Sequence, residues 1–170
     1  MLHRSCDRAI VSGNTVYDNL DSGVSLYESF DCQVYNNVLE SNLHGIRFSN
    51  GAGDNSFYNN DIINNDRYAI YLYKGNDAQQ AERNEDGHPR GNSIYSNNIW
   101  AEDVYTIWRM RNADSNSFLD NTFYSGGRAK LTTSTDNYVE GNTFPDDFGL
   151  SVDDTSCFDP LSQAWAEPQC

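Results

Sequence analysis

The sequence repeats a short pattern, Asn14-Thr15-Val16, Asn37-Val38-Leu39 and Asn60-Asp61-Ile62, in which an apolar residue follows an asparagine two places later. These copies are 23 residues apart, and later copies begin at Asn98, Asn121 and Asn142. A fixed period of this length indicates a solenoid in which each repeat forms one coil. We interpret the asparagine as a turn residue whose side-chain amide bonds the same residue one coil away.

Between the asparagines, most repeats carry a small residue followed by a short apolar alternation. The copies are Gly23-Val24-Ser25-Leu26, Gly45-Ile46-Arg47-Phe48 and Ala69-Ile70-Tyr71-Leu72, with weaker versions at 108–110 and 129–131. This alternation predicts a strand with two residues inward and one outward. The period is too short for a propeller blade, and the leucine pattern of a horseshoe repeat is absent. We therefore predict an all-β fold, a right-handed parallel β-helix of about five coils of about 23 residues.

One inserted loop and one terminal tail interrupt this pattern. Asn60 and Asn98 are 38 residues apart, which is 15 more than one coil, and the surplus forms a polar loop at 75–90. Such a loop is either a lid over a groove or simply mobile, and both interpretations stay open. The pattern stops at Pro145. We predict a β-helix domain over residues 1–145 and a tail over 146–170 that caps the last coil.

Composition and cysteine spacing restrict the possible partners. The chain has 25 acidic and 11 basic residues and a net charge of −14, which argues against nucleic-acid binding. It has neither a run of 18 apolar residues nor the apolar stretch of a signal peptide at its start, so we expect no membrane association. Cys157 and Cys170 suit a local disulfide, whereas Cys6 and Cys32 are expected to be packed thiols. Without a CxxC motif we expect no metal and no cofactor, and we expect a monomer.

Alignment of the coils places six of the eleven basic residues on one strip, interleaved with tyrosines. The first outward column contains Ser25, Arg47, Tyr71, Arg109 and Lys130, and the next contains His3, Tyr27, Ser49, Tyr73, Arg111 and Thr132. A third column adds Arg4, Glu28, Asn50, Lys74 and Asn112. Coils stack about 4.8 Å apart, so the strip is a ladder of cations and rings along the axis. It suits an extended acidic polysaccharide, although a solvated face with internal ion pairs is the alternative. The expected ligand-binding residues are His3, Tyr27, Arg47, Tyr71, Tyr73, Lys74, Arg109, Arg111 and Lys130.

Residues 14–50 resemble the later coils of the alginate (polymannuronate) C5-epimerases. The resemblance rests on the run DSGVSLYES at 21–29 and the run HGIRFSN at 44–50. It implies inversion at C5 of D-mannuronate within the polymer to give L-guluronate, and a location in the periplasm, the cell wall or outside the cell. Residues 2–5 align one coil before 26–29, at the place where the family carries the arginine that meets the substrate carboxylate. The resemblance therefore makes Arg4 the expected catalytic residue.

The catalytic base of that family is missing from the sequence. The base is a histidine in an Asp-Pro-His motif, and the sequence Asp86-Gly87-His88-Pro89 contains these residue types only in a different order. We therefore expect the chain to bind polymannuronate weakly and to epimerise it far more slowly than a chain that carries the missing motif. Two alternatives stay open, a non-catalytic β-helix that binds an acidic polysaccharide and a polysaccharide lyase, which also abstracts the C5 proton.

Overall fold

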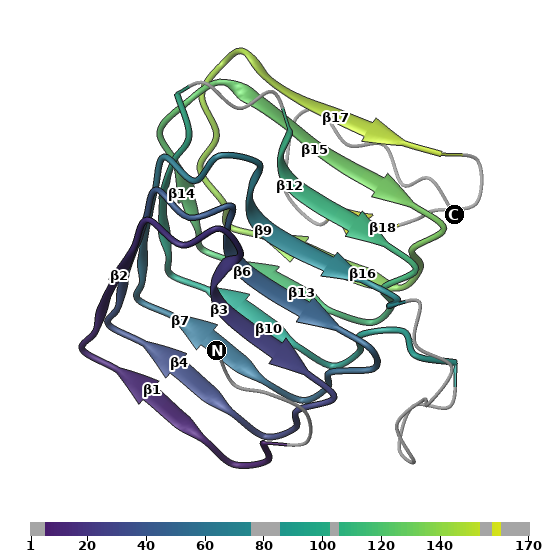
Figure 1. Cartoon of the computed structure of the whole chain (residues 1–170). Helices are drawn as coiled ribbons and strands as arrows, with labels where there is room; N and C mark the ends of the chain where they lie inside the picture. Colours follow the sequence, from purple (N-terminus) through teal and green to yellow (C-terminus); the bar gives the residue numbers. More distant parts are fainter. Residues whose placement is uncertain (1–5, 76–85, 103–105, 154–157, 161–170) are drawn as a thin grey trace.

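The computed structural model of the chain describes residues 6–75, 86–102, 106–153 and 158–160 (Figure 1). In these ranges the regular structure consists of strands, which form three parallel sheets wound around one axis. The predicted fold class is confirmed, with about six turns where the sequence predicted about five. No helix that could cross a membrane occurs in the described ranges.

The first five coils contribute one strand to each sheet, and the later strands belong to two of the sheets only. The seven-stranded sheet contains β1 (Ile10–Ser12), β4 (Gln33–Tyr35), β7 (Ser56–Tyr58), β10 (Ser93–Tyr95), β13 (Ser117–Leu119), β16 (Asn137–Glu140) and β18 (Phe158–Pro160). The five-stranded sheet contains β2 (Thr15–Tyr17), β5 (Val38–Glu40), β8 (Asp61–Ile63), β11 (Asn98–Trp100) and β14 (Thr122–Phe123). The six-stranded sheet contains β3 (Ser22–Tyr27), β6 (His44–Ser49), β9 (Tyr68–Tyr73), β12 (Thr106–Arg111), β15 (Gly127–Thr132) and β17 (Phe148–Val152).

The core is a set of apolar columns, because equivalent residues of successive coils stack on one another. The short strands of the seven-stranded sheet contribute one central inward side chain each, as Val34, Phe57, Ile94 and Phe118 do. The longer strands of the six-stranded sheet contribute two each, such as Ile46 and Phe48 on β6. All six side chains named here are at most 1% exposed, so their burial stabilises the stack.

Asparagine ladders hold the turns together. In the predicted ladder the Nδ2 group of Asn14 donates to Oδ1 of Asn37 at 3.0 Å, and Nδ2 of Asn37 donates to Oδ1 of Asn60 at 3.0 Å. The backbone N–H of each rung donates to the same oxygen, so every interior Oδ1 atom accepts two bonds. Two further ladders, which the sequence interpretation missed, run through Asn19, Asn42 and Asn65 and through Asn55, Asn92, Asn116 and Asn137.

Residues in the left-handed region turn the chain between sheets. Asn36 and Asn59 have φ values of 54° and 52°, and Ser96 and Asp120 take the same place in later coils. Short polar side chains tolerate this conformation because they can hydrogen-bond to the nearby backbone. The abundance of Asn, Asp and Ser between the strands is therefore a requirement of the coil geometry.

The structure corrects two details of the repeat. The rung after Asn60 is Asn97, not Asn98, because Asn97 points inward and accepts the bond from Asn60 at 3.0 Å, whereas Asn98 pairs with Asp61 on the outside. In addition, β17 pairs with β15 and β18 pairs with β16, so two sheets continue beyond Pro145. The strand of this sixth coil, Phe148-Gly149-Leu150-Ser151-Val152, shows the apolar alternation of the earlier strands. The repeated asparagine is absent from this stretch. The capping role of residues 146–170 stays a prediction.

Other expectations fall partly outside the described residues. Cys6 and Cys32 are unbridged, and the Cys32 thiol lies 2.7 Å from the Cys6 carbonyl oxygen. Burial raises the pKa of Cys32. Cys157, Cys170 and residues 76–85 of the inserted loop lie outside the described ranges, so the disulfide and the lid stay predictions.

Candidate functional site

The outward face of the six-stranded sheet carries the two strand columns expected from the sequence. Strand pairing aligns Ser25, Arg47, Tyr71, Arg109 and Lys130 in one column, and Tyr27, Ser49, Tyr73, Arg111 and Thr132 in the next. Side chains in these columns extend from the same face, one coil above another. The charges along this face are satisfied very differently at its two ends.

At the end nearest the N-terminus, Arg47 is bound by a carboxylate of the protein itself. Its NH1 and NH2 groups donate to the two Asp21 carboxylate oxygens at 2.8 and 3.1 Å, and its Nε group donates to the Ser25 hydroxyl at 3.1 Å. The Arg47 side chain is only 18% exposed. A bidentate pair of this kind satisfies the fork of the guanidinium. Arg47 is therefore neutralised, which supports the ion-paired alternative for this part of the strip.

His44 lies beside this pair and is almost completely covered. It is 3% exposed, and its ring stacks on Tyr68 with centroids 5.2 Å apart and planes 6° apart. Its Nδ1 atom is buried and has no hydrogen-bond partner in the described part of the chain. Burial, with a smaller effect of the Arg47 charge, lowers the pKa of His44 from 6.5 to about 4. His44 is therefore neutral at pH 7. We call Asp21, Ser25, His44 and Arg47 the paired end.

Tyrosines from β9 occupy the middle of the face. Tyr71 stacks on Tyr73 with centroids 4.5 Å apart and planes 9° apart, and it meets Tyr68 at a tilt of 51°. The Arg67 guanidinium lies 5.2 Å from the centre of the Tyr68 ring. Burial raises the pKa of Tyr71, so its phenol remains a neutral hydrogen-bonding group. The cluster is a partly exposed aromatic surface with a cation at its edge.

Beyond the tyrosines, Arg109 is fixed by neutral groups. Its NH1 group donates to the carbonyl oxygens of Met110 and Lys130, at 2.7 and 3.0 Å, and to the Thr132 hydroxyl at 2.8 Å. Within the described ranges, no carboxylate forms an ion pair with Arg109, Arg111 or Lys130. Arg109 is thus oriented while its charge stays uncompensated. We call Tyr71, Tyr73, Arg109, Arg111 and Lys130 the open patch.

The remaining expected site residues lie at the edges of this face or outside the described residues. His3 and Arg4 fall outside the described residues. Tyr27, the last residue of β3, belongs to the second column, and its hydroxyl accepts a bond from Asn50 in the turn after β6. Lys74 follows the end of β9. The sequence interpretation did not single out Asp21, Tyr68 or Arg67. The register of β6 and β9, which aligns His44 with Tyr68, could have revealed Tyr68.

A second polar cluster fixes the residues that follow the inserted loop. Nδ1 of His88 lies 2.6 Å from Oδ2 of Asp114, and Arg90 contacts both Asp86 and Asp114. Asp114 also accepts a bond from the Thr135 backbone at 3.0 Å. The cluster therefore joins the chain after the loop to the following coils. Across the described ranges, no three His, Cys, Asp or Glu side chains are placed to hold a metal ion.

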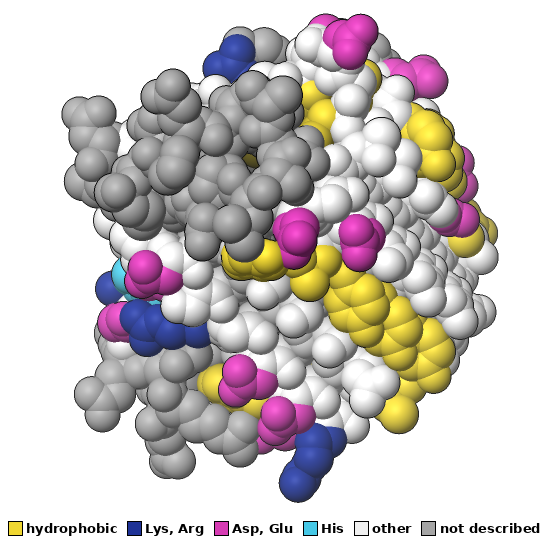
Figure 2. Space-filling model, turned by 180° about the vertical axis from the view of Figure 1, so that it is seen from behind, with side chains coloured by type: hydrophobic (Ala, Val, Ile, Leu, Met, Phe, Trp, Pro, Cys, Tyr) yellow, Lys and Arg dark blue, Asp and Glu magenta, His cyan; other side chains and the backbone are white. Residues whose placement is uncertain are grey.

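The opposite side of the molecule has a different character. Figure 2 shows a diagonal row of hydrophobic side chains there, with acidic groups scattered around it. On the seven-stranded sheet, Tyr35, Tyr58 and Tyr95 form a stack with centroids 5.0 and 4.8 Å apart. The Tyr58 ring lies between the other two and nearly parallel to both, so both of its faces are covered. We interpret this tyrosine stack as a stabilising ladder.

Fold and surface together define the class of this protein, a parallel β-solenoid with an aromatic and cationic face on one sheet. The chain belongs to the NosD family, described as periplasmic copper-binding proteins, whose model matches residues 1–169. No curated protein and no solved structure matches the chain.

This family assignment corrects the resemblance to alginate C5-epimerases. The shared runs are largely made of residues that the coil itself requires. A Cβ atom on Gly45 would lie 2.4 Å from the Ile62 side chain, Glu28 takes a φ of 48°, and Arg47 binds Asp21. The runs therefore reflect solenoid geometry. The catalytic role given to Arg4 rested on that resemblance and no longer has a basis.

Proposed function

We propose that this chain is a non-catalytic binding protein that holds an acidic saccharide chain on the open patch. The observation that carries the proposal is the state of Arg109, which neutral oxygens hold in place while its charge has no carboxylate partner among the described residues. A pre-positioned cation of this kind loses little side-chain freedom when a ligand carboxylate arrives. Arg111 and Lys130 extend the positive charge over neighbouring positions.

The tyrosines support a saccharide rather than a simple anion. Tyr71 is adjacent to Arg109 in the strand register, and Tyr73 is adjacent to Arg111. A sugar ring offers apolar C–H groups to an aromatic ring and hydroxyls to a phenol, while a uronate carboxylate pairs with a guanidinium. The open patch contains both kinds of group within two columns. Because the chain as a whole is strongly acidic, weak binding of anions elsewhere on its surface is disfavoured.

Binding without turnover agrees with the residue types of the patch. Abstraction of a C5 proton needs a base within hydrogen-bond reach of that carbon. A tyrosine is an effective base at neutral pH only when its pKa is lowered, and burial raises the pKa of Tyr71 in the open patch. The nearby His44 has a buried Nδ1 atom, and its ring packs against Tyr68 and Tyr71. The non-catalytic alternative therefore has better support than the lyase.

The family description also raises copper as a ligand. Copper sites in proteins use His, Cys and Met donors in close groups. Cys6 and Cys32 lie together, but His44 is packed under tyrosines and His88 is paired with Asp114. As stated above, the described residues contain no three-donor group. They do not fit a copper site, and we derive no binding step through this metal.

Calorimetric titration with a polymannuronate oligomer tests the proposal. We expect saturable binding that weakens as salt rises, and no binding of a neutral dextran oligomer of equal length. Lys130→Gln should weaken binding about threefold to tenfold, because it removes one exposed cation. Arg8→Asn is the matched control, since Arg8 is exposed in the turn before β1 and Asn accepts its φ of 58°.

Three outcomes would contradict this function. Equal binding of the neutral oligomer would show that charge does not determine binding. An unchanged affinity of Lys130→Gln would show that the ligand does not bind at the open patch. Formation of guluronate or of unsaturated ends during the titration would show that the protein is an enzyme.

A further inference from the structure

Strand register divides the open patch into three steps along the solenoid axis (Figure 1). β9 contributes Tyr71 and Tyr73, β12 contributes Arg109 and Arg111, and β15 contributes Lys130. Neighbouring strands lie about 4.8 Å apart, which is close to the length of one sugar residue in an extended chain. A saccharide that runs along the axis therefore places one residue on each of the three strands.

The step on β9 offers a fixed aromatic surface. Tyr71 stacks on Tyr73 with centroids 4.5 Å apart, and its ring meets Tyr68 at a tilt of 51°. The second face of Tyr73 contacts no ring in the described part of the chain. Burial raises the pKa of Tyr71, which shows that this position disfavours negative charge. A neutral sugar residue therefore suits this step better than a uronate.

The steps on β12 and β15 carry the cations. Arg109 is held by two carbonyl oxygens and by the Thr132 hydroxyl, and Arg111 extends from the same strand into solvent. β15 adds the exposed Lys130. The step on β12 thus has two cations and the step on β15 has one. Each of these two steps is suited to one carboxylate of the ligand.

A carboxylate of the protein follows the last cation. Ser151 on β17 is the register partner of Lys130. Asp153 follows β17 and accepts bonds from the Thr133 backbone N–H at 3.1 and 3.0 Å, so it lies at the turn after β15. A uronate on the far side of β15 would meet a hydroxyl and an anion. Like charges repel, so the acidic part of the ligand ends at Lys130.

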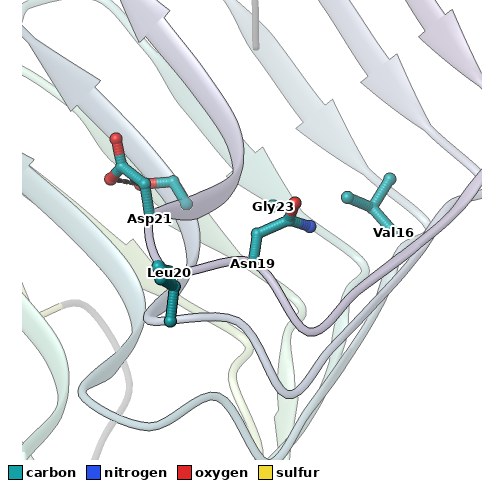
Figure 3. A pocket seen from close by; sticks show the side chains of 6 residues that line it. Val16, Asn19, Leu20, Asp21 and Gly23 are labelled. Atoms are coloured by element: carbon teal, nitrogen blue, oxygen red, sulfur yellow. Dashed lines mark hydrogen bonds between the residues drawn. The ribbon is translucent and has the colours of Figure 1, made fainter.

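Another carboxylate limits the face at the opposite end. Figure 3 shows the Asp21 side chain at the turn before β3, directed away from Val16. Its Oδ1 atom accepts a bond from the Ser22 hydroxyl at 3.3 Å and a bond from Arg47 at 2.8 Å. Asp21 thereby cancels the charge of Arg47. A uronate placed before the tyrosines would gain no free cation from this pair.

We propose that the open patch selects a three-residue saccharide segment, with a neutral residue on β9 and two consecutive uronates on β12 and β15. This inference rests on the proposed function and adds the pattern of charges that the ligand carries. A third uronate would place a carboxylate beside the tyrosines, and a single uronate would fill only one of the two cationic steps. The ligand is therefore a polysaccharide that contains both neutral and acidic residues.

Calorimetry with three modified trimannuronates tests the order of the steps. Each trisaccharide has one of its three carboxylates reduced to the alcohol, which leaves one neutral mannose residue. We expect one of the two end-modified isomers to bind at least as tightly as the unmodified trisaccharide. The centre-modified isomer should bind about tenfold or more weakly, and the other end-modified isomer about threefold to tenfold more weakly.

Two variants assign these losses to particular strands. In Lys130→Gln the weaker end-modified isomer and the unmodified trisaccharide should bind within about twofold of each other, because the cation that pairs with this carboxylate is absent. The control Arg8→Asn, at the exposed turn before β1, should keep the full difference between the two ligands. An undiminished difference in Lys130→Gln would overturn the assignment of a uronate to β15.

The remaining outcomes separate this inference from the proposed function. Equal losses for the three isomers would overturn the neutral step while the proposed function stands, since Lys74 after Tyr73 would then pair with a third carboxylate. Equal affinities for all four trisaccharides would overturn the charge pattern. Absence of binding by both unmodified trimannuronate and polymannuronate would contradict the proposed function itself, and the inference with it.

Discussion

The paired end and the open patch occupy the same sheet face and share residue types, yet their charges are satisfied differently. Arg47 is bound by Asp21 and is 18% exposed, whereas Arg109 bonds only to neutral oxygens. Arg47 and Arg109 belong to the same column in the strand register. A column of cations in a solenoid is therefore not a column of equivalent binding sites. A carboxylate on a neighbouring turn decides which of them is free.

The largest expected effect concerns the buried histidine of the paired end. Because the folded-state pKa of His44 is lowered to about 4 from 6.5, the native state binds fewer protons than the unfolded state between these values. The contribution of His44 to stability is complete above pH 6.5 and is lost as pH falls toward 4. This loss amounts to about 3 kcal/mol.

Urea unfolding at several pH values, for the wild type and His44→Gln, measures this effect. The difference between the two free energies of unfolding should change by the stated amount between pH 6.5 and 4. A constant difference would show that His44 titrates normally, and that the paired end is more open to solvent than the structure indicates.

The next effect concerns the asparagine ladder, which stabilises the coils that carry both regions. Asn37→Ala removes donors to Asn60, Val11 and Tyr35 and leaves the Asn14 amide without its acceptor. We expect the free energy of unfolding to fall by about 1–3 kcal/mol, with an unchanged affinity of the open patch. Asn14→Ala is the matched control at an exposed first rung and should cost less. Equal losses in chemical denaturation would count against the ladder as the source of stability.

The smallest effect is expected from a substitution that makes the paired end resemble the open patch. Asp21→Asn removes the carboxylate that neutralises Arg47, so the paired end gains a cation. We expect the affinity for polymannuronate, measured by calorimetry, to rise about twofold to threefold. An unchanged or lower affinity would mean that neutralisation by Asp21 is not what keeps Arg47 from binding.

The sequence predicted the fold well because the fold depends on local, repeated requirements. The spacing of Asn14, Asn37 and Asn60 gave the coil length, and the alternation around Ile46 and Ile70 gave the inward columns. The pattern failed where two asparagines were adjacent, at 97 and 98, because spacing alone does not say which side chain points inward. It also missed the sixth coil, where Phe148 to Val152 form a strand without an asparagine rung.

The alignment of the outward columns could be predicted, whereas the binding role of their residues stays a prediction. Strand register followed from the repeat, so the columns through Tyr71 and Tyr73 were correct. The pairing of Arg47 with Asp21 depends on a contact 26 residues away, between one turn and the next strand. Likewise, the burial of His44 depends on how Tyr68 and Tyr71 pack over it. Neither contact follows from a period, so both required the structure.

The affinities of Arg109→Gln and Arg47→Gln for polymannuronate, measured side by side by calorimetry, test the central claim most directly. Arg109→Gln should weaken the affinity for polymannuronate by about tenfold or more, because the substitution removes a charge-assisted contact. Arg47→Gln should lower stability but leave the affinity within about twofold of the wild type, because its charge is already neutralised. Equal losses in the two variants, or a larger loss in Arg47→Gln, would contradict the division of this face into a paired end and an open patch.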